Sequence, residues 1–513
     1  MTAPDPAATE AALHTYRPDL VPVFRQALPG AQAAVLARLW GAYAREPLPG
    51  LVGRRTEGGR LVCALAGGHT LAGPEAASRP FADPTTLWLT LDGVPFADPA
   101  TLFSALAGPD HPFAVELANS VANLALARAA QPAPDPTIPL TATLLEQSVV
   151  DGHPLHPGCR TRLGMSTLDV LRYGPEHRPV VPLALVAVPE DRFLHTGQWP
   201  DRLRADGRIL LPVHPWQAEY VLPAYPDLRP TGASLTAEPL MSLRSLATVD
   251  GAWQLKTAVD VQMTSAIRIV SPAAVRNGPV LSAFLADLAV RVGGLALVPE
   301  TAAGAVLVDG EPSRSLAVVI RRPPDQLAVP AAALAAPSPA TGRTLAADLA
   351  GAAPHEFLAQ LVRVLVPPLQ ALLDLGVALE AHGQNTLVVF HSGRPESLLY
   401  RDLGGIRVSP ARLRSHGIDP PPVYGDLVDD DPAVLRCKVL AGALSTVVAQ
   451  VVTALAAAYG EEPDALWRTV APALRRLSLG TGPWPIKATT AMRLAIDPLD
   501  DLWTDLPNPL EAL

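Results

Sequence analysis

Apolar and polar positions follow two different periods along this chain. The middle of the chain contains short apolar runs, partly β-branched and bounded by turn residues, which are typical of β-strands. The last third repeats apolar residues every three to four positions, which predicts helices. The strand-like runs are residues 208–215, 253–262, 302–308 and 316–322, and the helical runs are residues 355–366 and 433–452. Residues 385–390 and 397–403 predict a β-hairpin between those helices, so the whole pattern predicts an α+β fold.

Two segments rich in proline and alanine divide this pattern. They are residues 131–139 and 329–342, and because both are poor in large apolar side chains we expect linkers or long loops. A chain of 513 residues is too long for one ordinary hydrophobic core. We therefore predict three regions, residues 1–140, 141–345 and 346–513.

Composition narrows the class of protein. Hydrophobic residues make up 49% of the chain and charged residues 17%, which indicates a folded globular protein. The formal net charge is −9 and no run of Lys or Arg is present, so no nucleic-acid partner is expected. Cys63, Cys159 and Cys437 are far apart, which argues against a disulfide framework or a zinc site and suits a reducing, cytoplasmic compartment.

No membrane association is expected. The first residues lack a basic stretch followed by an apolar one, so no signal peptide is predicted. Residues 439–459 carry no charge and are long enough to cross a bilayer. Because this segment is rich in alanine and contains Ser445, Thr446 and Gln450, we expect a buried helix instead.

The first polar cluster contains two His-Pro pairs. Each proline restricts the residue before it to an extended conformation, so His153 and His156 are held in place. Arg160 and Arg162 follow, and guanidinium groups pair with carboxylates or phosphates through two hydrogen bonds. The spacing alone favours a simpler alternative, a rigid turn whose histidines bind backbone carbonyls. A third pair, at His214, indicates by itself a turn at the end of a strand.

The second cluster lies in residues 255–272. In one extended strand, Lys256, Asp260 and Gln262 share a polar face opposite an apolar one, as the floor of a cleft requires. An ordinary solvent-facing strand has the same pattern.

The same segment ends in residues suited to phosphate. Thr264 and Ser265 are expected to cap a following helix, where backbone N–H groups bind anions. The cations Arg244, Lys256 and Arg268 together suit a polyphosphate.

The third cluster combines carboxylates, an imidazole and amides. Glu380, His382 and Gln384 alternate, Asn385 follows, and Asp402 lies beyond the predicted hairpin turn. Magnesium prefers one or two carboxylates together with phosphate oxygens, so this set predicts a Mg²⁺–triphosphate site. The alternative is a buried polar network that supports the hairpin.

Other nucleotide and catalytic signatures are absent from the sequence. It contains no GxxxxGK[ST] loop, no GxGxxG after a strand, no GxSxG and no HExxH. An ATP site would therefore be built from scattered side chains.

Taken together and in this order, the segments GHPLHPGCRTRLG, LPVHPWQ, KTAVDVQMTSAIR, EAHGQN and RDLGG resemble the IucA/IucC family of NRPS-independent siderophore synthetases. The resemblance covers roughly residues 145–410. It implies a fold likened to a cupped hand, with residues 1–140 as thumb, 141–345 as fingers with an antiparallel sheet, and 346–513 as a mainly helical palm.

The resemblance also implies roles for individual residues. Nucleotide and substrate contacts fall on Ser242, Arg244, Lys256, Thr264, Arg268, His382, Gln384, Asn385 and Asp402, and the positions associated with Mg²⁺ are Glu380 and Asp402. His153 and His156 match the loop near the phosphates. Arg160 stands where the family usually has lysine, which keeps the charge but changes the donor geometry.

The implied reaction uses ATP and Mg²⁺ to adenylate a carboxylate of citrate or a related acid. An amine or alcohol then displaces AMP to give an amide or ester. The acid, the nucleophile, the general base and the resulting siderophore stay open, and a homodimer is expected only as the commonest oligomer.

Two other functions stay open at this point. His382, Asn385 and Asp402 faintly resemble the catalytic loop of small-molecule kinases, which release ADP. A catalytically silent paralogue that binds nucleotide or siderophore is the second alternative.

Overall fold

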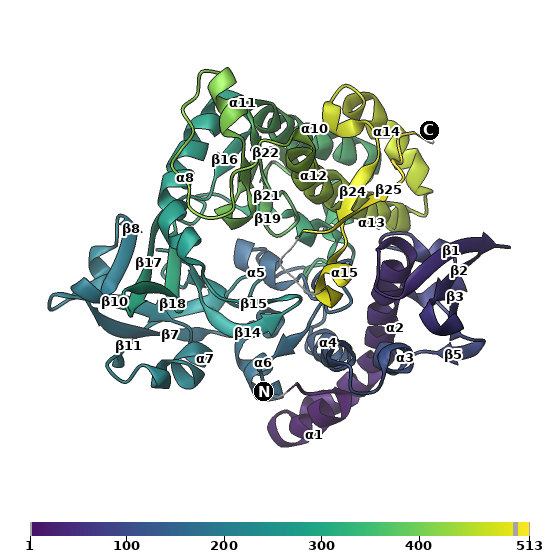
Figure 1. Ribbon diagram of the computed structural model, residues 1–513, viewed down its shortest axis with the longest axis horizontal. Coiled ribbons are helices and arrows are strands. Elements are labelled where there is room, and N and C mark those ends of the chain that lie inside the picture. The colour runs from purple at the N-terminus through teal and green to yellow at the C-terminus, as the bar shows by residue number, and fades with distance from the viewer. Residues whose placement is uncertain (1–2, 496–500, 512) are drawn as a thin grey trace.

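The computed structural model describes residues 3–495, 501–511 and 513. Its amino-terminal region packs helices beside a five-stranded sheet of order β1-β2-β3-β4-β5 (Figure 1). The strands are β1 (Leu51–Glu57), β2 (Arg60–Leu65), β3 (Thr70–Pro74), β4 (Leu89–Leu91) and β5 (Val94–Phe96). The helices are α1 (Pro6–Tyr16), α2 (Val21–Arg45), α3 (Pro99–Ala107) and α4 (Pro112–Ala129). Phe24 and Trp40 of α2 are fully buried in the core that joins these elements.

A nine-stranded sheet of order β8-β17-β18-β13-β12-β11-β7-β10-β9 forms the middle of the molecule. Its strands are β7 (Val181–Pro189), β8 (Phe193–Gly197), β9 (Arg204–Ala205), β10 (Arg208–Val213), β11 (Arg229–Pro239), β12 (Ser245–Thr248), β13 (Gln254–Thr257), β17 (Glu300–Val308) and β18 (Glu311–Arg321). Neighbouring strands are antiparallel throughout. The α8 helix (Pro272–Val292) packs against β17 and β18, and the predicted strand-rich region is confirmed.

The polar strand predicted over residues 255–264 is two strands. Lys256 belongs to β13 of the large sheet, whereas Asp260 and Gln262 belong to β14 (Val259–Met263). β14 pairs with β15 (Ala266–Arg268) and β6 (Arg162–Leu163) in a separate three-stranded sheet. Asp260 accepts hydrogen bonds from Gln217 and Ser315 instead of facing the cleft, so the prediction of one continuous floor was wrong.

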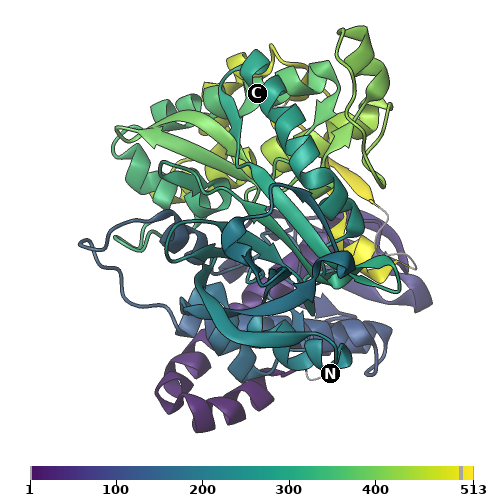
Figure 2. The same cartoon turned by 90° about the vertical axis from the view of Figure 1, so that its left-hand side faces the viewer.

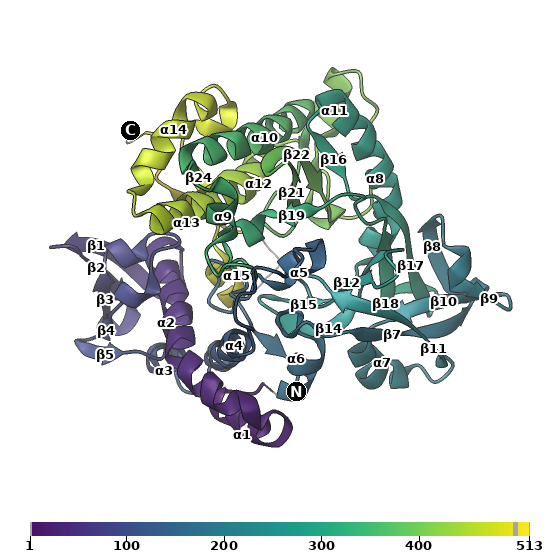
Figure 3. The same cartoon turned by 180° about the vertical axis from the view of Figure 1, so that it is seen from behind.

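The carboxyl-terminal region is mainly helical, and the predicted hairpin lies within it (Figure 1). The helices are α9 (Leu345–Ala350), α10 (Pro354–Leu375), α11 (Pro410–Ser415), α12 (Pro432–Gly442), α13 (Ala449–Tyr459) and α14 (Pro463–Leu474), with a π-helix over Ala443–Val448. The hairpin strands β21 (Thr386–His391) and β22 (Arg394–Tyr400) pair with β19 (Ala328–Pro330) and β16 (Leu295–Leu297), respectively. Figure 3 shows α9 and α13 lying beside α10. The α+β fold class is confirmed.

The first half of the second segment predicted as a linker or long loop is instead part of the core, whereas residues 336–342 form a loop as expected. Residues 328–330 form an edge strand and residues 331–335 a 3-10 helix. Val329 and Leu334 are buried, and Ala332 donates its backbone N–H to the carbonyl of Gly383. Small side chains fill this tight space, so a low content of large apolar residues did not indicate a loop.

Two helical segments, Pro354–Leu375 and Pro432–Tyr459, are long and apolar enough to span a bilayer. In their most apolar windows, 56% and 72% of the residues are buried inside the protein. Figure 2 shows the helical region lying over the strand-rich region. The prediction that residues 439–459 form a buried helix is confirmed, and the three cysteines are free thiols as expected.

The chain returns to its amino-terminal region near its end. β24 (Trp484–Lys487) and β25 (Trp503–Leu506) pair, and α15 (Thr489–Leu494) contacts α2. The buried Glu46 accepts hydrogen bonds from the backbone N–H groups of Thr490 and Ala491, both 2.8 Å long. Because this packing crosses the region boundaries, the division at residues 140 and 345 stays a prediction.

Candidate active site

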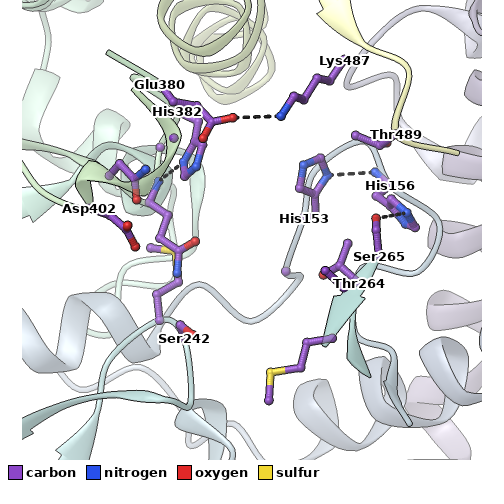
Figure 4. A pocket seen from close by; sticks show the side chains of 18 of the residues that line it. His153, His156, Ser242, Thr264, Ser265, Glu380, His382, Asp402, Lys487 and Thr489 are labelled. Carbon is purple, nitrogen blue, oxygen red and sulfur yellow. Dashed lines mark hydrogen bonds and ion pairs between the residues drawn. The ribbon is translucent and has the colours of Figure 1, made fainter. Parts of the chain in front are cut away.

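A cavity of about 710 Å³ lies between the strand-rich region and the helical region. Asp260 and Gln262 of the predicted cleft floor do not line it, but every residue given a catalytic, nucleotide-binding or magnesium role from the sequence does. These are His153, His156, Arg160, Ser242, Arg244, Lys256, Thr264, Arg268, Glu380, His382, Gln384, Asn385 and Asp402. Figure 4 shows Ser242, Glu380, His382 and Asp402 on one side of the cavity and His153, His156 and Thr264 on the other. The separated clusters therefore form one site.

An ion pair joins the two walls. The Lys256 ammonium donates to both carboxylate oxygens of Asp402, at 2.7 and 2.6 Å, across 146 positions of sequence. Burial lowers the pKa of Lys256 to about 8, with Arg244 and Arg321 adding to the effect and Asp402 opposing it. Burial alone would raise the pKa of Asp402, but Lys256 and Arg321 hold it well below its ordinary value. The pair is therefore charged at neutral pH.

The Asp402 backbone is held in an uncommon conformation. Its φ is +73°, in the region that favours glycine, and its carboxylate also accepts the backbone N–H of Gly404. Arg321 of β18 lies 3.5 Å from the same carboxylate and was not predicted. Strain of this kind persists where surrounding contacts fix the residue, and such positions cluster at functional sites.

Glu380 is held by two lysines from later segments of the chain. Lys487 of β24 lies 3.0 Å from its carboxylate and Lys438 of α12 lies 3.9 Å away, and both lysines also contact Asp501. Burial acts to raise the pKa of Glu380, but Lys487 and the neighbouring His382 lower it overall. A side chain at Gly405 would come within 2.0 Å of the other carboxylate oxygen, so the glycine gives Glu380 its room.

Both predicted magnesium positions are thus paired with lysine. Within the described residues, no group of three or more His, Cys, Asp and Glu side chains is arranged to hold a metal. A metal here would need oxygens from a ligand, which is how Mg²⁺ binds beside phosphates. The assignment of Glu380 and Asp402 to Mg²⁺ stays a prediction.

The cavity histidines are anchored by backbone amides. His153 Nδ1 accepts N–H groups from Leu155 and His156, at 3.3 and 3.0 Å, and His382 Nδ1 accepts that of Gln384 at 3.3 Å. The rigid turn offered as the alternative for His153 and His156 is therefore present, but Nδ1 of each ring accepts backbone N–H groups instead of binding carbonyls. An Nδ1 that accepts is unprotonated, so each neutral ring carries its proton on Nε2. Burial lowers the pKa of His153 to about 3, and His382 and Arg38 reinforce it.

Arg160 lines the cavity, but most of its donors serve the protein. Its guanidinium donates to the carbonyls of Val149 and Val150, and lies 3.3 Å from buried Glu176. Arg162 forms a two-pronged pair with the same carboxylate, at 2.6 and 2.9 Å. This arrangement shows Arg160 holding the His-Pro loop in shape.

Two other arginines keep donors for a ligand. Arg244 donates to the carbonyl of Ile269 at 2.7 Å and Arg268 to that of Met263 at 2.8 Å. Each bond engages one nitrogen of a group with five N–H donors. Burial lowers the pKa of Arg244 to about 10, and Arg268 adds to the effect. Both therefore remain positive at neutral pH.

A buried ion pair supports the loops on either side of the cavity. Glu146 of α5 (Ala142–Gln147) and Arg401 lie 2.6 Å apart, with side chains 2% and 5% exposed. Glu146 also accepts the backbone N–H of Met241, next to Ser242. Arg401 donates twice to the carbonyl of Gln384. Removing either partner would loosen both loops.

Two sequence expectations near the site are corrected. Thr264 and Ser265 form the turn between β14 and β15 rather than a helix cap, because the following helix begins at Pro272 and is capped by Ser271. His214 does not line the cavity; its Nδ1 caps α7 (Pro215–Tyr220), as the turn interpretation expected.

Two family models match parts of this chain. The IucA / IucC family model matches residues 141–336. A second model, described as Ferric iron reductase FhuF-like transporter, matches residues 355–481. The resemblance seen in the sequence motifs is confirmed.

Curated relatives carry related names. Staphyloferrin A synthase of Staphylococcus aureus is 28% identical over 310 residues, which cover 52% of this chain and 53% of that protein. The L-2,3-diaminopropanoate--citrate ligase of the same species is 27% identical over 312 residues, covering 52% of this chain and 54% of that protein. The matches to these two relatives thus span about half of their length.

Solved structures of proteins named for siderophore biosynthesis share the fold over nearly the whole chain. The petrobactin biosynthesis protein AsbB from Bacillus anthracis has a TM-score of 0.78 at 19% identity, covering 96% of this chain and 98% of that one. The ATP-bound aerobactin synthetase IucA from Klebsiella pneumoniae has a TM-score of 0.73 at 20% identity, covering 94% and 99%. The fold of this protein is therefore that of these synthetases, whereas the cupped-hand description stays a prediction.

Proposed function

We propose that this protein is an ATP-dependent siderophore synthetase that adenylates a carboxylate of citrate or a related acid. The acyl adenylate then condenses with an amine or alcohol to give an amide or ester. One observation carries the proposal: a single cavity combines Arg244, Lys256 and Arg268 with Asp402. Relatives named as citrate ligases and a structural neighbour described as ATP-bound support the same reading.

The first step needs positive charge around the phosphates. A carboxylate oxygen of the acid attacks the α-phosphorus of ATP, and the bond to the departing pyrophosphate breaks. Lys256 and Arg244 would neutralise the phosphates, and His153 would donate its Nε2 proton as a hydrogen bond to the leaving group. Preorganised donors of this kind gain strength in a cavity that excludes water.

The acid requires a second group of cations. Citrate carries three carboxylates, and one of them must lie beside the α-phosphorus. Arg268, His382 and Lys487 line the cavity and provide donors for the others. The amine or alcohol then attacks the acyl carbon, and AMP leaves with the bonding electron pair. A covalent link to the protein is not required.

Magnesium fits this site only together with ATP. The Asp402 carboxylate lies in the cavity and has the oxygen donors that Mg²⁺ prefers, with phosphate oxygens supplying the rest. When bound, Mg²⁺ supplies charge neutralisation of the phosphates. In the present structure it is the Lys256 ammonium that neutralises the Asp402 carboxylate. The cytoplasmic location and the homodimer stay predictions.

The test is acid-dependent release of pyrophosphate. The protein is incubated with ATP, Mg²⁺ and a panel of acids, and hydroxylamine traps the acyl adenylate as a hydroxamate. We expect pyrophosphate, AMP and hydroxamate with at least one acid, and a loss of about 100-fold or more in Lys256→Met. A matched control, Arg17→Met, removes a cation from an exposed ion pair and should leave the rate unchanged.

Other products would contradict the proposal. Release of ADP with an amine or alcohol would identify a kinase. Tight ATP binding without any nucleotide turnover, across the whole acid panel, would identify a silent binding protein.

A further inference from the structure

A serine and a histidine meet at the tip of the β14–β15 hairpin, inside the cavity (Figure 4). Ser265 Oγ lies 3.0 Å from His156 Nε2, and both residues line the cavity. In a site proposed for acyl transfer, such a pair raises the question of a serine nucleophile activated by histidine. The direction of the hydrogen bond decides the answer.

The second nitrogen of His156 fixes that direction. His156 Nδ1 accepts the backbone N–H of Gly158 at 2.7 Å, so Nδ1 carries no proton. The neutral ring is then protonated on Nε2, which donates to Ser265 Oγ. His156 is fully buried, and burial together with His153 lowers its pKa well below the ordinary value.

Glycine at position 158 permits this arrangement. A Cβ there would lie 2.9 Å from Cε1 and 3.0 Å from Nδ1 of His156. Protonation of Nδ1 would place its proton against the Gly158 N–H. The local backbone therefore keeps His156 as a donor toward Ser265.

A general base needs a free lone pair on the nitrogen that faces the serine, and Nε2 has none in this form. The serine oxygen accepts from His156, so the hydroxyl proton of Ser265 is directed to another acceptor. The turn supports this presentation: Met263 and Ala266 pair across it, and Thr264 has a φ of +60°, which a β-branched residue rarely adopts. Arg268 of β15 stabilises the hairpin by donating a hydrogen bond to the carbonyl of Met263 in β14.

We propose that Ser265 donates its hydroxyl proton in a hydrogen bond to an anionic oxygen of the bound ligand, with His156 as the positioning residue that holds it. The ligand oxygen belongs to a phosphate of ATP or to a carboxylate of the acid. The acyl group passes from AMP to the incoming amine or alcohol without being esterified to Ser265. This inference rests on the proposed function and adds a donor that the sequence motifs did not assign.

Two pairs of variants test the roles. Ser265→Ala removes the hydroxyl and Ser265→Thr keeps it, so we expect a loss of about 10- to 100-fold only in the alanine variant. A rise in the dissociation constant for ATP, measured by calorimetry, assigns the phosphate; a rise only in KM for the acid assigns the carboxylate. If both variants match the wild type in both quantities, the inference is overturned.

The histidine variants separate the two nitrogens. Glutamine places an amide N–H near the position of Nε2, whereas asparagine places an acceptor near Nδ1. We expect His156→Gln to retain more ATP affinity or pyrophosphate release than His156→Asn, with thermal unfolding confirming that both are folded. Equal losses in two folded variants would contradict a positioning role through Nε2.

Two independent measurements test the tautomer of His156 and the absence of an acyl-serine intermediate. The ¹⁵N chemical shifts of the His156 ring, assigned with the asparagine variant, should show an unprotonated Nδ1 and a protonated Nε2 whether or not turnover occurs; the opposite tautomer overturns the inference. Mass spectrometry of the wild type after incubation with ATP and acid should find no acyl group on Ser265, and an adduct there would overturn it while leaving the ligase function intact. Absence of acid-dependent pyrophosphate release would contradict only the proposed function.

Discussion

Replacing Glu146 by Gln tests the idea that one buried ion pair holds both rims of the cavity. Glutamine keeps the shape and one acceptor, but it leaves the Arg401 charge without a counterion. Removing one partner of a buried pair costs about 3–5 kcal/mol, because the other charge stays in a medium of low dielectric. Since glutamine still accepts a hydrogen bond, we expect the lower end, about 3 kcal/mol.

The chain offers a matched control of the same length. Arg55 and Glu57 also lie 2.6 Å apart, but their side chains are 57% and 60% exposed. An exposed pair contributes about 0–1 kcal/mol, so Glu57→Gln should be close to neutral. Burial, rather than distance, is then the variable under test.

The assay is urea unfolding followed by circular dichroism, with the free energies of unfolding compared at equal m-values. The double variant Glu146→Met/Arg401→Met should lose less stability than either single variant, because no unpaired charge is left. ATP affinity should fall in Glu146→Gln, since the loops next to Met241 and Gln384 both lose an anchor. Equal losses in Glu146→Gln and Glu57→Gln would refute the reasoning.

Three further changes have defined outcomes. Gly405→Ala should lower pyrophosphate release about tenfold or more, because its Cβ would meet the Glu380 carboxylate; a rate equal to that of the wild type would show that the carboxylate moves freely. Arg268→Ala should abolish turnover in the same assay, and near-normal turnover would mean that the acid binds elsewhere. Burial raises the pKa of Glu46 to about 7 from an ordinary value of 4.5, so its contribution to stability is present below pH 4.5 and is lost as the pH rises to about 7. The difference between the two pKa values corresponds to about 3 kcal/mol. Glutamine still accepts both N–H groups of α15, so in Glu46→Gln the unfolding midpoint should depend less on pH over this range. A pH dependence equal to that of the wild type would contradict the pKa shift.

The hairpin was predictable because its information is local. Apolar runs on both sides of a turn place Asn385 and Asp402 at the same end, and Arg401 indeed donates its backbone N–H to the Asn385 carbonyl. The cations Arg244, Lys256 and Arg268 were predicted from residue type, because an anionic ligand needs positive charge wherever it lies in the sequence. The shared cavity of the predicted residues follows from these two facts together with the family motifs.

Long-range partners were not predictable in this way. Lys487 and Arg321 lie in ordinary strand segments, and only the folded chain brings them to Glu380 and Asp402. No local pattern distinguishes such a lysine or arginine from an exposed one. The one feature of the sequence that could have indicated Lys487 and Arg321 is a cation within an otherwise apolar run.

Two errors have the same physical origin. Lys256, Asp260 and Gln262 keep the same two-residue spacing on either side of Ala258, so periodicity could not show that the strand changes sheets there. Similarly, Ala331 and Ala333 are buried although they are small, because this segment packs closely against the backbone of Gly383. In both cases tertiary packing, which local composition does not encode, determined the structure.

The position of Lys487 in the cavity wall has a consequence for synthesis of the protein. The lining extends from Val149 to Trp503, so a nascent chain emerging from the ribosome has no complete site until Trp503 has been translated. Until then Glu380 lacks Lys487 as a partner, so burying its carboxylate would be unfavourable and it remains hydrated. Ligand binding therefore reports on the folding of residues 149–503 together, and ATP would selectively stabilise molecules in which all of these segments have folded.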